Sequence, residues 1–515
     1  MLLYNVFNIM DSTYTPTLYL PEKYRVFSGP QTNVALCTCW ADPTLLIHKY
    51  DQILKTFSIT GTLYSREGVS ILIRNLCLNP TIDTVIIWAN NPLSKTAIGS
   101  AGRNALCSLW KHGVDAQHTI VDTGVKLHKE IETHYLDKLR KSVHLVDMSD
   151  SPMDDVFKES IKLTKSHLQP YMKSVFFPEP KREKMPTMPS EKVGWSIHAK
   201  KTTDAWVKVV DKIIRYGDVK KTESGSGQKE LQHISWTISN ETIDQFHIPD
   251  WPAAVKEQVG LNPDMLNQYK QIFLTGDKPA DSAYTYGNRL YSYPGPINQM
   301  QHIIEKLRLH RETRRAYATT FYPPTDHELS SPPCLTSIQF LTTPENQLNM
   351  FATFRSHDIF KAALPNAFGL LHLQQYVAGE TQLRPGSLTI DSVSAHIYEE
   401  DWQMATDTLK CALWERTKLY FDENEDIDPR GLMRISVQST DIHVELQNEQ
   451  ADILFEYTGK SAREVALKIA RLDLLSMPAH YVDVCIELTK AEIAIKTENE
   501  YIQDRPLKVG SSVIK

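Results

Sequence analysis

The stretch Ser331-Pro-Pro-Cys-Leu-Thr-Ser-Ile-Gln-Phe340 places a thiol, Cys334, between two prolines and an apolar, strand-like run. Because proline fixes its own φ and restricts the residue before it, we expect Cys334 to lie in a stiff turn. Arginines occur within about twenty residues on either side of it. Positive charge of this kind would lower the pKa of the thiol and make it a nucleophile. A lone cysteine is more often a small buried hydrophobe, so the interpretation depends on its neighbours.

Those neighbours follow a fixed order and spacing. Working outward from Cys334, the chain carries Arg314-Arg315, then Arg355-Ser356-His357-Asp358, then Asn366 and finally His396-Ile397-Tyr398. Arg314 lies twenty residues before Cys334, and Asn366 lies eleven residues after Arg355. This arrangement resembles thymidylate synthase and its relatives, the deoxypyrimidine-monophosphate hydroxymethylases.

The resemblance extends on both sides of that stretch. Tyr284-Thr-Tyr286-Gly287 is similar to a Tyr-Gly segment of the family, and the tail from His480 to Leu507 resembles its archaeal branch. Leu335 after the thiol is also typical of that branch, where bacterial-type enzymes have histidine. The resemblance covers about three fifths of the chain, residues 193–515. It implies an α+β thymidylate synthase-type catalytic domain with a mixed sheet, forming a homodimer through its sheets.

The resemblance also implies the chemistry of the site. Cys334 would attack carbon 6 of dUMP, so that carbon 5 becomes nucleophilic and accepts a one-carbon unit, giving dTMP. The remaining residues would bind the reactants: Arg355 and Ser356 the phosphate, Arg314 and Arg315 the phosphate of the neighbouring subunit, His396 and Tyr398 the deoxyribose, and Asp358 the pterin. For these charged residues, surface ion pairing or a purely structural carboxylate in the turn is the alternative reading.

The resemblance implies that Asn366 determines which pyrimidine base is bound. A carboxamide can accept a hydrogen bond from N3–H of uracil and donate one to O4, whereas the cytosine hydroxymethylases resemble this family but carry aspartate at the corresponding position. Asn366 therefore favours dUMP over dCMP.

Several points stay open from sequence. The glutamate that activates the pyrimidine could be Glu230, Glu241 or Glu257, and Glu223 stands where relatives often carry a phosphate-binding arginine. The cofactor could be 5,10-methylenetetrahydrofolate or methylene-tetrahydromethanopterin. Exclusion of water would decide between methylation and hydroxymethylation. A catalytically silent nucleotide-binding or scaffold protein is the alternative from another class.

Residues 1–176 predict a separate α/β domain. Val34–Cys37 and Thr84–Trp88 indicate buried strands, and residues 68–76 and 101–113 indicate helices, a pattern typical of a parallel sheet covered on both faces. The segment resembles the corrinoid-carrying, flavodoxin-like component of tetrahydromethanopterin S-methyltransferase, without a counterpart of its cobalt-binding histidine. The small residues of 90–102 could bind a phosphate or pterin at a helix N-terminus, or the domain could serve as a scaffold. Four prolines mark residues 177–192 as a linker.

Composition sets the class of protein. The 515 residues carry 41% hydrophobic and 23% charged residues and a net charge of −6, typical of a globular chain and unfavourable for general nucleic-acid or membrane-surface binding. Seven scattered cysteines suggest reduced thiols, with Cys37-Thr-Cys39 lacking the second pair that a zinc site needs. We therefore expect a cytoplasmic protein without a metal site, signal segment or membrane span.

Overall fold

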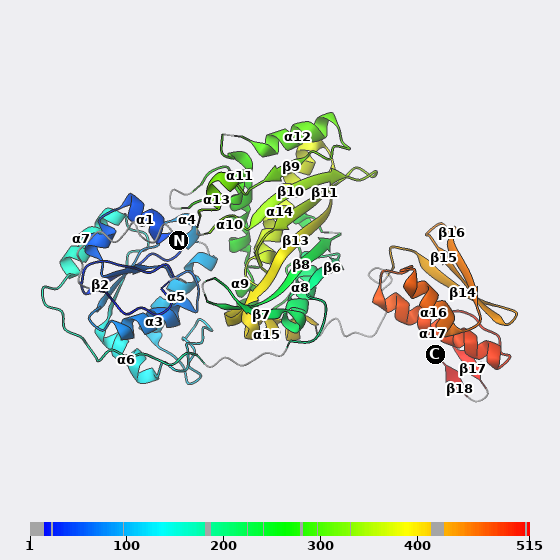
Figure 1. Ribbon diagram of the computed structural model, residues 1–515, viewed down its shortest axis with the longest axis horizontal. Helices are drawn as coiled ribbons and strands as arrows, with labels where there is room; N and C mark the ends of the chain where they lie inside the picture. Colours follow the sequence, from blue (N-terminus) through cyan, green and yellow to red (C-terminus); the bar gives the residue numbers. More distant parts are fainter. Residues whose placement is uncertain are drawn as a thin grey trace. The chain divides into compact units, whose positions relative to one another are not determined.

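The computed structural model describes residues 15–21, 24–95, 97–180, 187–223, 225–239, 241–278, 282–295, 297–329, 331–413, 427–509 and 512–514. The chain divides into two compact units, Met1–Trp414 and Glu415–Lys515. The first unit contains a five-stranded and an eight-stranded sheet, and the second contains a three-stranded sheet and a two-stranded ribbon. Figure 1 labels most of their helices and strands.

The five-stranded sheet has the order β1-β3-β2-β4-β5. Its strands are β1 (Phe27–Ser28), β2 (Val34–Cys37), β3 (Ile59–Gly61), β4 (Thr84–Ile87) and β5 (His144–Asp147). Strands β2 to β5 run parallel, but β1 pairs antiparallel with β3. The sheet is therefore mixed, whereas the sequence had indicated a purely parallel one. The difference lies at the edge, where a two-residue strand carries no sequence pattern.

Helices cover both faces of this sheet. One apolar cluster joins it to α3 (Gly68–Leu78), α5 (Ala97–His112) and α6 (Thr133–Ser142). A second apolar cluster joins the opposite face of the sheet to α1 (Pro43–Lys49), α2 (Ile53–Thr56) and α7 (Met153–Leu163). The short helix α4 (Pro92–Lys95) precedes α5. Every residue of β2 and β4 is buried, as their continuous apolar runs predicted. Gly113, with φ of +81°, ends α5 in a conformation that glycine adopts without steric cost.

The start of the proline-rich segment is fixed to the first sheet domain. Phe177 is buried in the cluster beneath α3, and the buried Arg74 donates to the carbonyls of Phe177 (3.0 Å) and Pro178 (2.9 Å). At the other end, the Met188 N–H donates to the Arg215 carbonyl (2.7 Å). The described ends of the segment are therefore bound to the regions that they adjoin, both of which lie in the compact unit Met1–Trp414.

The eight-stranded sheet has the order β6-β8-β13-β11-β10-β9, with β12 beside β13 and β7 beside β8. Its strands are β6 (Val193–Ala199), β7 (Asp218–Lys221), β8 (Gly227–Ile238), β9 (Tyr317–Thr319), β10 (Leu335–Thr342), β11 (Gln347–Phe354), β12 (His357–Asp358) and β13 (Arg384–Tyr398). Parallel pairs (β6–β8, β11–β13, β12–β13) occur with antiparallel ones, so this sheet is mixed, as expected.

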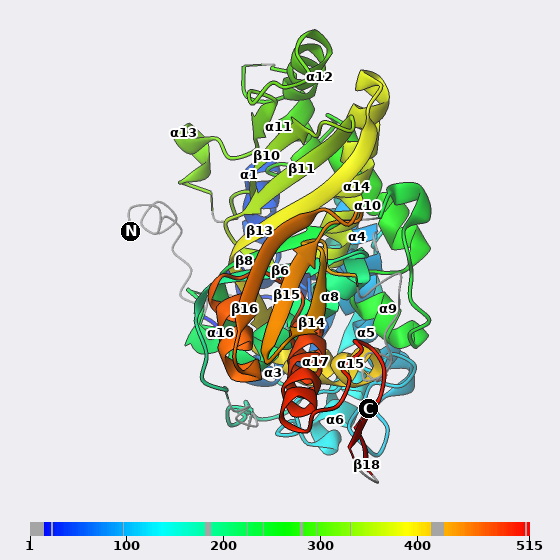
Figure 2. The same ribbon diagram turned by 90° about the vertical axis from the view of Figure 1, so that its right-hand side faces the viewer.

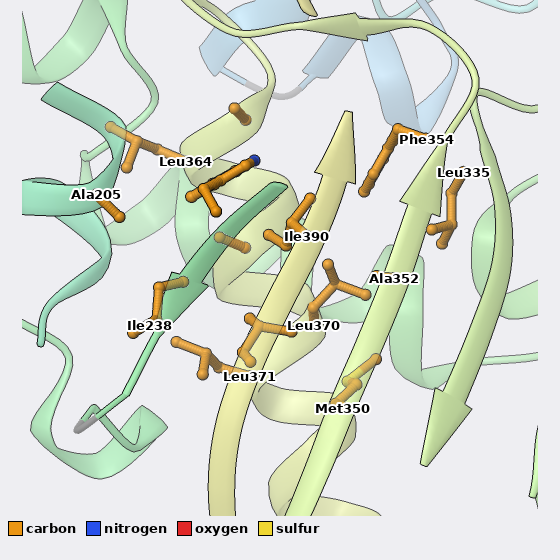
Figure 3. Packing of buried hydrophobic residues seen from close by; sticks show 14 of the residues in the cluster. Ala205, Ile238, Leu335, Met350, Ala352, Phe354, Leu364, Leu370, Leu371 and Ile390 are labelled. Carbon is orange, nitrogen blue, oxygen red and sulfur yellow. The ribbon is translucent and has the colours of Figure 1, made fainter. Parts of the chain in front are cut away.

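The core of the second sheet lies against α14 (Ala363–Thr381) and α8 (Thr202–Tyr216). Figure 3 shows Leu370 and Leu371 of α14 beside Ile390 of β13 and Met350 of β11. Alternate residues of β11 are buried while Gln347, Asn349, Phe351 and Thr353 are partly exposed, so the helices cover one face. Around this core lie α9 (Ala253–Gln258), α10 (Pro263–Leu274), α11 (Tyr286–Tyr291), α12 (Gln299–Leu309), α13 (Pro323–Asp326) and α15 (Trp402–Leu413), with short 3₁₀ turns at Ile243–Gln245 and Glu399–Asp401. None of the described helices is long and apolar enough to cross a membrane.

The second unit has a core of its own. Its sheet consists of β14 (Leu432–Gln438), β15 (Asp441–Gln447) and β16 (Ile453–Gly459), which are seen in Figure 2. The sheet packs with α16 (Ala462–Arg471) and α17 (Pro478–Lys496). The strands β17 (Leu507–Val509) and β18 (Ser512–Ile514) follow. The sequence had assigned residues 193–515 to one catalytic domain. The compact units divide within that range, after Trp414.

Candidate active site

Cys334 lies in the turn that leads into β10, and Arg355 holds that turn in place. The backbone N–H of Arg355 donates to the Cys334 carbonyl at 2.9 Å. Its side chain donates from Nε to the Pro333 carbonyl (2.9 Å) and from Nη2 to the Pro332 carbonyl (2.8 Å). Three consecutive carbonyls before β10 are therefore bound by one arginine at the end of β11, while Arg355 stays exposed to a ligand.

Burial dominates the electrostatics of the thiol. Cys334 is packed against the main core, and this burial raises the pKa of its thiol above the ordinary value, an effect that Arg355 opposes and Asp358 reinforces. The sequence had predicted a lowered pKa from the neighbouring arginines. In this structure the desolvation of the thiolate outweighs the single arginine whose charge acts on it.

Three tyrosines surround the thiol. Tyr284 and Tyr286 have ring centroids 6.0 Å apart, and the Tyr284 hydroxyl donates to the Pro332 carbonyl at 3.4 Å. Burial raises the pKa of Tyr269, Tyr284 and Tyr286, and the charge of the Cys334 thiolate adds to this effect at each of them. These phenols are therefore protonated hydrogen-bond donors at neutral pH. Tyr269, on α10, carried no recognisable signal in the sequence.

Asn366 occupies the first turn of α14 and is buried with both ends of its amide engaged. Its Oδ1 accepts a hydrogen bond from the Tyr269 hydroxyl at 3.0 Å. Its Nδ2 lies 3.2 Å from Nε2 of His357. The proposed base-reading group thus has a hydrogen-bonding neighbour at each end of its amide, from two different segments.

His357 is the buried centre of this arrangement. Its Nδ1 lies 2.9 Å from Oγ of Ser392, and its ring stacks on Phe354 with centroids 3.9 Å apart and planes inclined by 5°. Burial, together with a smaller effect of the neighbouring His396, lowers the pKa of His357 to about 3, so the imidazole is neutral. The sequence motif Arg-Ser-x-Asp treats this position as variable, which is why His357 was missed.

Asp358 serves the turn that leads into α14. Its Oδ1 accepts from the N–H groups of Phe360 (3.1 Å) and Lys361 (3.0 Å), and the carboxylate stays only partly buried. It therefore has the structural role that the sequence left open, while its second oxygen can still meet a ligand. Ser356, beside it, is also partly exposed.

A polar row crosses three strands next to the turn. Asp358 of β12 faces His396 of β13, which in turn faces Glu230 of β8. The His396 ring meets Tyr398 edge-on with centroids 5.0 Å apart. The structure therefore brings the predicted residues Cys334, Arg355, Ser356, Asp358, Asn366, His396 and Tyr398 to one end of the eight-stranded sheet.

Comparison with known proteins matches this region. The thymidylate synthase family model covers residues 206–452. Relatives with provisional names as thymidylate synthases include proteins of Methanosarcina acetivorans (33% identical over 218 residues, 42% of this chain and 96% of the relative) and Methanothermobacter marburgensis (34% over 224 residues, 42% and 99%). A protein of Methanocaldococcus jannaschii with the same provisional name is 34% identical over 202 residues, 38% of this chain and 86% of the relative. This chain belongs to the thymidylate synthase family.

In this thymidylate synthase family member, Arg314 and Arg315 lie apart from the Cys334 turn. Both side chains are exposed, and the Arg314 carbonyl accepts from Nε2 of Gln339 on β10 (3.0 Å). The described contacts of the turn include neither arginine. Within one chain they do not complete the site.

The three candidate glutamates differ in their surroundings. Glu241 accepts from the N–H groups of Thr202 (2.7 Å) and His247 (2.8 Å), so it joins two backbone segments. Glu257 is half-exposed and lies 3.6 Å from Arg66. Glu230 is buried, accepts from Gln228 (2.8 Å), contacts Lys220 and is the strand partner of His396. Of these three, only Glu230 belongs to the polar row, and Glu223 is an exposed residue of the β7–β8 connection.

A second family model, PterinBD-DUF4346, covers residues 427–504. It overlaps the thymidylate synthase match over 427–452 and falls within the unit Glu415–Lys515. The family match to the catalytic region therefore runs into β14 and β15 of a unit with its own core.

Proposed function

We propose that this chain transfers a one-carbon unit from a methylene-tetrahydropterin to carbon 5 of dUMP, giving dTMP. The observation that supports this most directly is the Cys334 turn, which Arg355 binds at three carbonyls beside a buried Asn366. A nucleophile in a fixed turn, a cation next to it and an oriented amide are the parts that addition to a pyrimidine requires.

The thiolate would add to carbon 6 of the ring, and the electron pair displaced from the C5–C6 double bond would form the bond from carbon 5 to the one-carbon unit as that unit's bond to nitrogen breaks. Loss of the carbon 5 proton and reduction of the attached carbon by hydride would then release the Cys334 thiolate from carbon 6 and restore the double bond. Because burial raises the pKa of Cys334, substrate binding has to promote loss of its proton. Arg355, whose charge favours the thiolate, and Ser356 would bind the phosphate. His396 and Tyr398 would hydrogen-bond the deoxyribose, which favours dUMP over its ribonucleotide.

Asp358 fits a pterin, since its carboxylate is partly exposed while one oxygen is held by the turn. A fixed carboxylate can accept from the N–H groups of a pterin ring. Bound there, the methylene-tetrahydropterin would supply the one-carbon unit and the hydride. Both 5,10-methylenetetrahydrofolate and methylene-tetrahydromethanopterin carry this ring, and the test below uses both.

We further propose a homodimer in which Arg314 and Arg315 bind the phosphate in the partner's site. Their exposure away from the Cys334 turn, and the face of the eight-stranded sheet that helices leave partly exposed, support this arrangement. The description of the second family model supports a pterin-binding role for the unit Glu415–Lys515. Titrating a fragment of residues 427–515 with each reduced pterin would test that role, and no binding would reject it.

The test of the reaction is the mass of the product formed from dUMP with each methylene-tetrahydropterin, with the Cys334→Ser variant as control. We expect the wild-type chain to add a methyl group to dUMP and the Cys334→Ser variant to add none, although the variant should still bind dUMP. Addition of a hydroxymethyl group to dUMP would identify the chain as a hydroxymethylase. Absence of product with either cofactor, with dCMP also tried, would favour a nucleotide-binding or scaffold role.

A further inference from the structure

The direction of the Asn366 amide depends on a chain of buried groups behind it. Trp236 Nε1–H donates to Oγ of Ser392 at 3.2 Å, and the same Oγ lies 2.9 Å from Nδ1 of His357. On the other side of the imidazole, Nε2 lies 3.2 Å from Nδ2 of Asn366. All four side chains are buried, so water does not replace these partners.

The donors along this chain follow from the orientation in which the structure places the Asn366 amide. An amide nitrogen can only donate, so Nε2 of His357 has to accept from Asn366 Nδ2 and carries no proton. A neutral imidazole then has its proton on Nδ1, which donates to Ser392 Oγ. On the far side of the amide, the protonated Tyr269 hydroxyl donates to Oδ1 of Asn366 at 3.0 Å. Every contact thus agrees with one orientation of the amide.

The opposite orientation requires the other tautomer. If Asn366 were flipped, its Oδ1 would face Nε2, which would then need the proton, and Nδ1 would have to accept from the Ser392 hydroxyl. The flipped amide would exchange its acceptor and its donor toward the ligand. One arrangement of acceptor and donor suits N3–H and O4 of uracil, and the exchanged one suits N3 and the 4-amino group of cytosine.

We propose that His357 is a positioning residue that sets the direction of the Asn366 amide, and thereby the preference for a uracil over a cytosine nucleotide, through its hydrogen bond to Ser392. This inference rests on the proposed function, in which Asn366 reads the base. Ser392 and Trp236 belong to the same chain of contacts, because Ser392 Oγ is the partner of Nδ1 and Trp236 donates to that oxygen. The stacked Phe354 holds the ring plane but contributes no polar group.

The test compares the dissociation constants of dUMP and dCMP, measured by calorimetry for the full chain and four variants. His357→Phe keeps a flat buried ring and removes both nitrogens. His357→Gln can still place an acceptor toward Asn366. Ser392→Ala removes the partner of Nδ1, and Phe354→Leu, the matched control, removes the stacking alone.

We expect the preference for dUMP over dCMP to fall by about tenfold or more in His357→Phe and Ser392→Ala, because one mispaired polar group typically costs this much. His357→Gln should retain most of the preference, and Phe354→Leu should weaken the binding of both nucleotides equally. An unchanged preference in a folded His357→Phe protein would overturn the inference. If that variant does not fold, an unchanged preference in Ser392→Ala would overturn it instead.

The two proposals can fail separately. A wild-type chain that prefers dUMP but gives no methylated or hydroxymethylated product would reject the proposed reaction. The ratio of the dUMP and dCMP dissociation constants in the variants would still test the role of His357. Turnover of dUMP with an unchanged ratio in His357→Phe and Ser392→Ala would reject the inference alone. A chain that binds neither nucleotide would overturn both.

Discussion

At the scale of single residues, the candidate active site combines residues that the sequence predicted with others, His357 and Tyr269, that it did not. Cys334 was visible because two prolines and flanking arginines are local signals. His357, Asn366 and Tyr269 meet only through folding, since a two-residue strand, a helix start and a separate helix bring them together. No periodicity in the sequence reports such a contact, because each residue is ordinary within its own segment.

The raised pKa of Cys334 makes its alkylation a direct measurement. Since burial raises this pKa and Arg355 opposes the effect, the rate of carboxamidomethylation of the peptide containing Cys334 should still be increasing at pH 9. Arg355→Gln should slow the reaction at pH 8 by about threefold or more, because it removes the opposing charge. Arg355→Lys, which keeps the charge, should slow it less. A plateau below pH 8 in the wild-type chain would contradict this account.

The neutral state of His357 also affects stability. Its pKa in the folded chain is lowered to about 3 from an ordinary 6.5, so between these values the unfolded chain binds more protons than the folded one. The free energy of unfolding should therefore decrease as pH falls through this range, by up to about 1.4 kcal/mol per pH unit from this residue. Urea unfolding at pH 7 and pH 5 should show a smaller decrease for His357→Gln than for the wild-type chain. Equal decreases would contradict the buried neutral imidazole.

At the scale of elements, Asp428 connects the first described residues of the second unit to the start of α17. Its carboxylate accepts from Ser476 N (2.8 Å), Ser476 Oγ (2.7 Å) and Met477 N (3.1 Å) and lies 3.2 Å from His480 Nδ1. Although burial alone would raise it, hydrogen bonds from the backbone N–H of Arg430 (3.0 Å), from Ser476 and from the N–H of Met477 lower the pKa of Asp428 to about 2. We expect Asp428→Ala to destabilise this unit by about 3 kcal/mol, because it removes several hydrogen bonds that a buried carboxylate accepts.

Circular dichroism of a fragment of residues 427–515 during heating would measure this loss, with Asp441→Ala as a control at a partly exposed position of β15. Equal melting temperatures for the two variants would contradict the role given to Asp428. The stability of this carboxylate interaction should be present above about pH 4 and lost as pH falls toward 2.

The elements that sequence predicted best are those decided by their own residues. β2 has the bounds expected from its apolar run, and α3 begins at the expected residue, Gly68. The division after Trp414 was missed because residues 415–426 carry charges without proline or glycine, unlike the linker at 177–192. β1 was missed because its pairing with β3 depends on tertiary contact alone.

At the scale of the whole molecule, the position of Arg314 and Arg315 predicts shared sites between two copies of the chain. Both arginines are exposed and belong to none of the described contacts of the Cys334 turn. If they bind phosphate in the partner's site, a chain with Arg314→Glu and Arg315→Glu retains a functional thiol for use with a partner's arginines. A Cys334→Ser chain retains functional arginines in the same way.

Two inactive chains should therefore restore activity when they are expressed together. In a mixed dimer one site receives Cys334 from one chain and both arginines from the other, while the second site receives neither. Random assortment makes half of the dimers mixed, so total activity should reach about a quarter of the wild-type value. Purification through two different affinity tags isolates the mixed dimer, whose activity should approach half. If the arginines served the thiol of their own chain, no combination of these two variants would contain an intact site, and the mixed dimer would remain inactive.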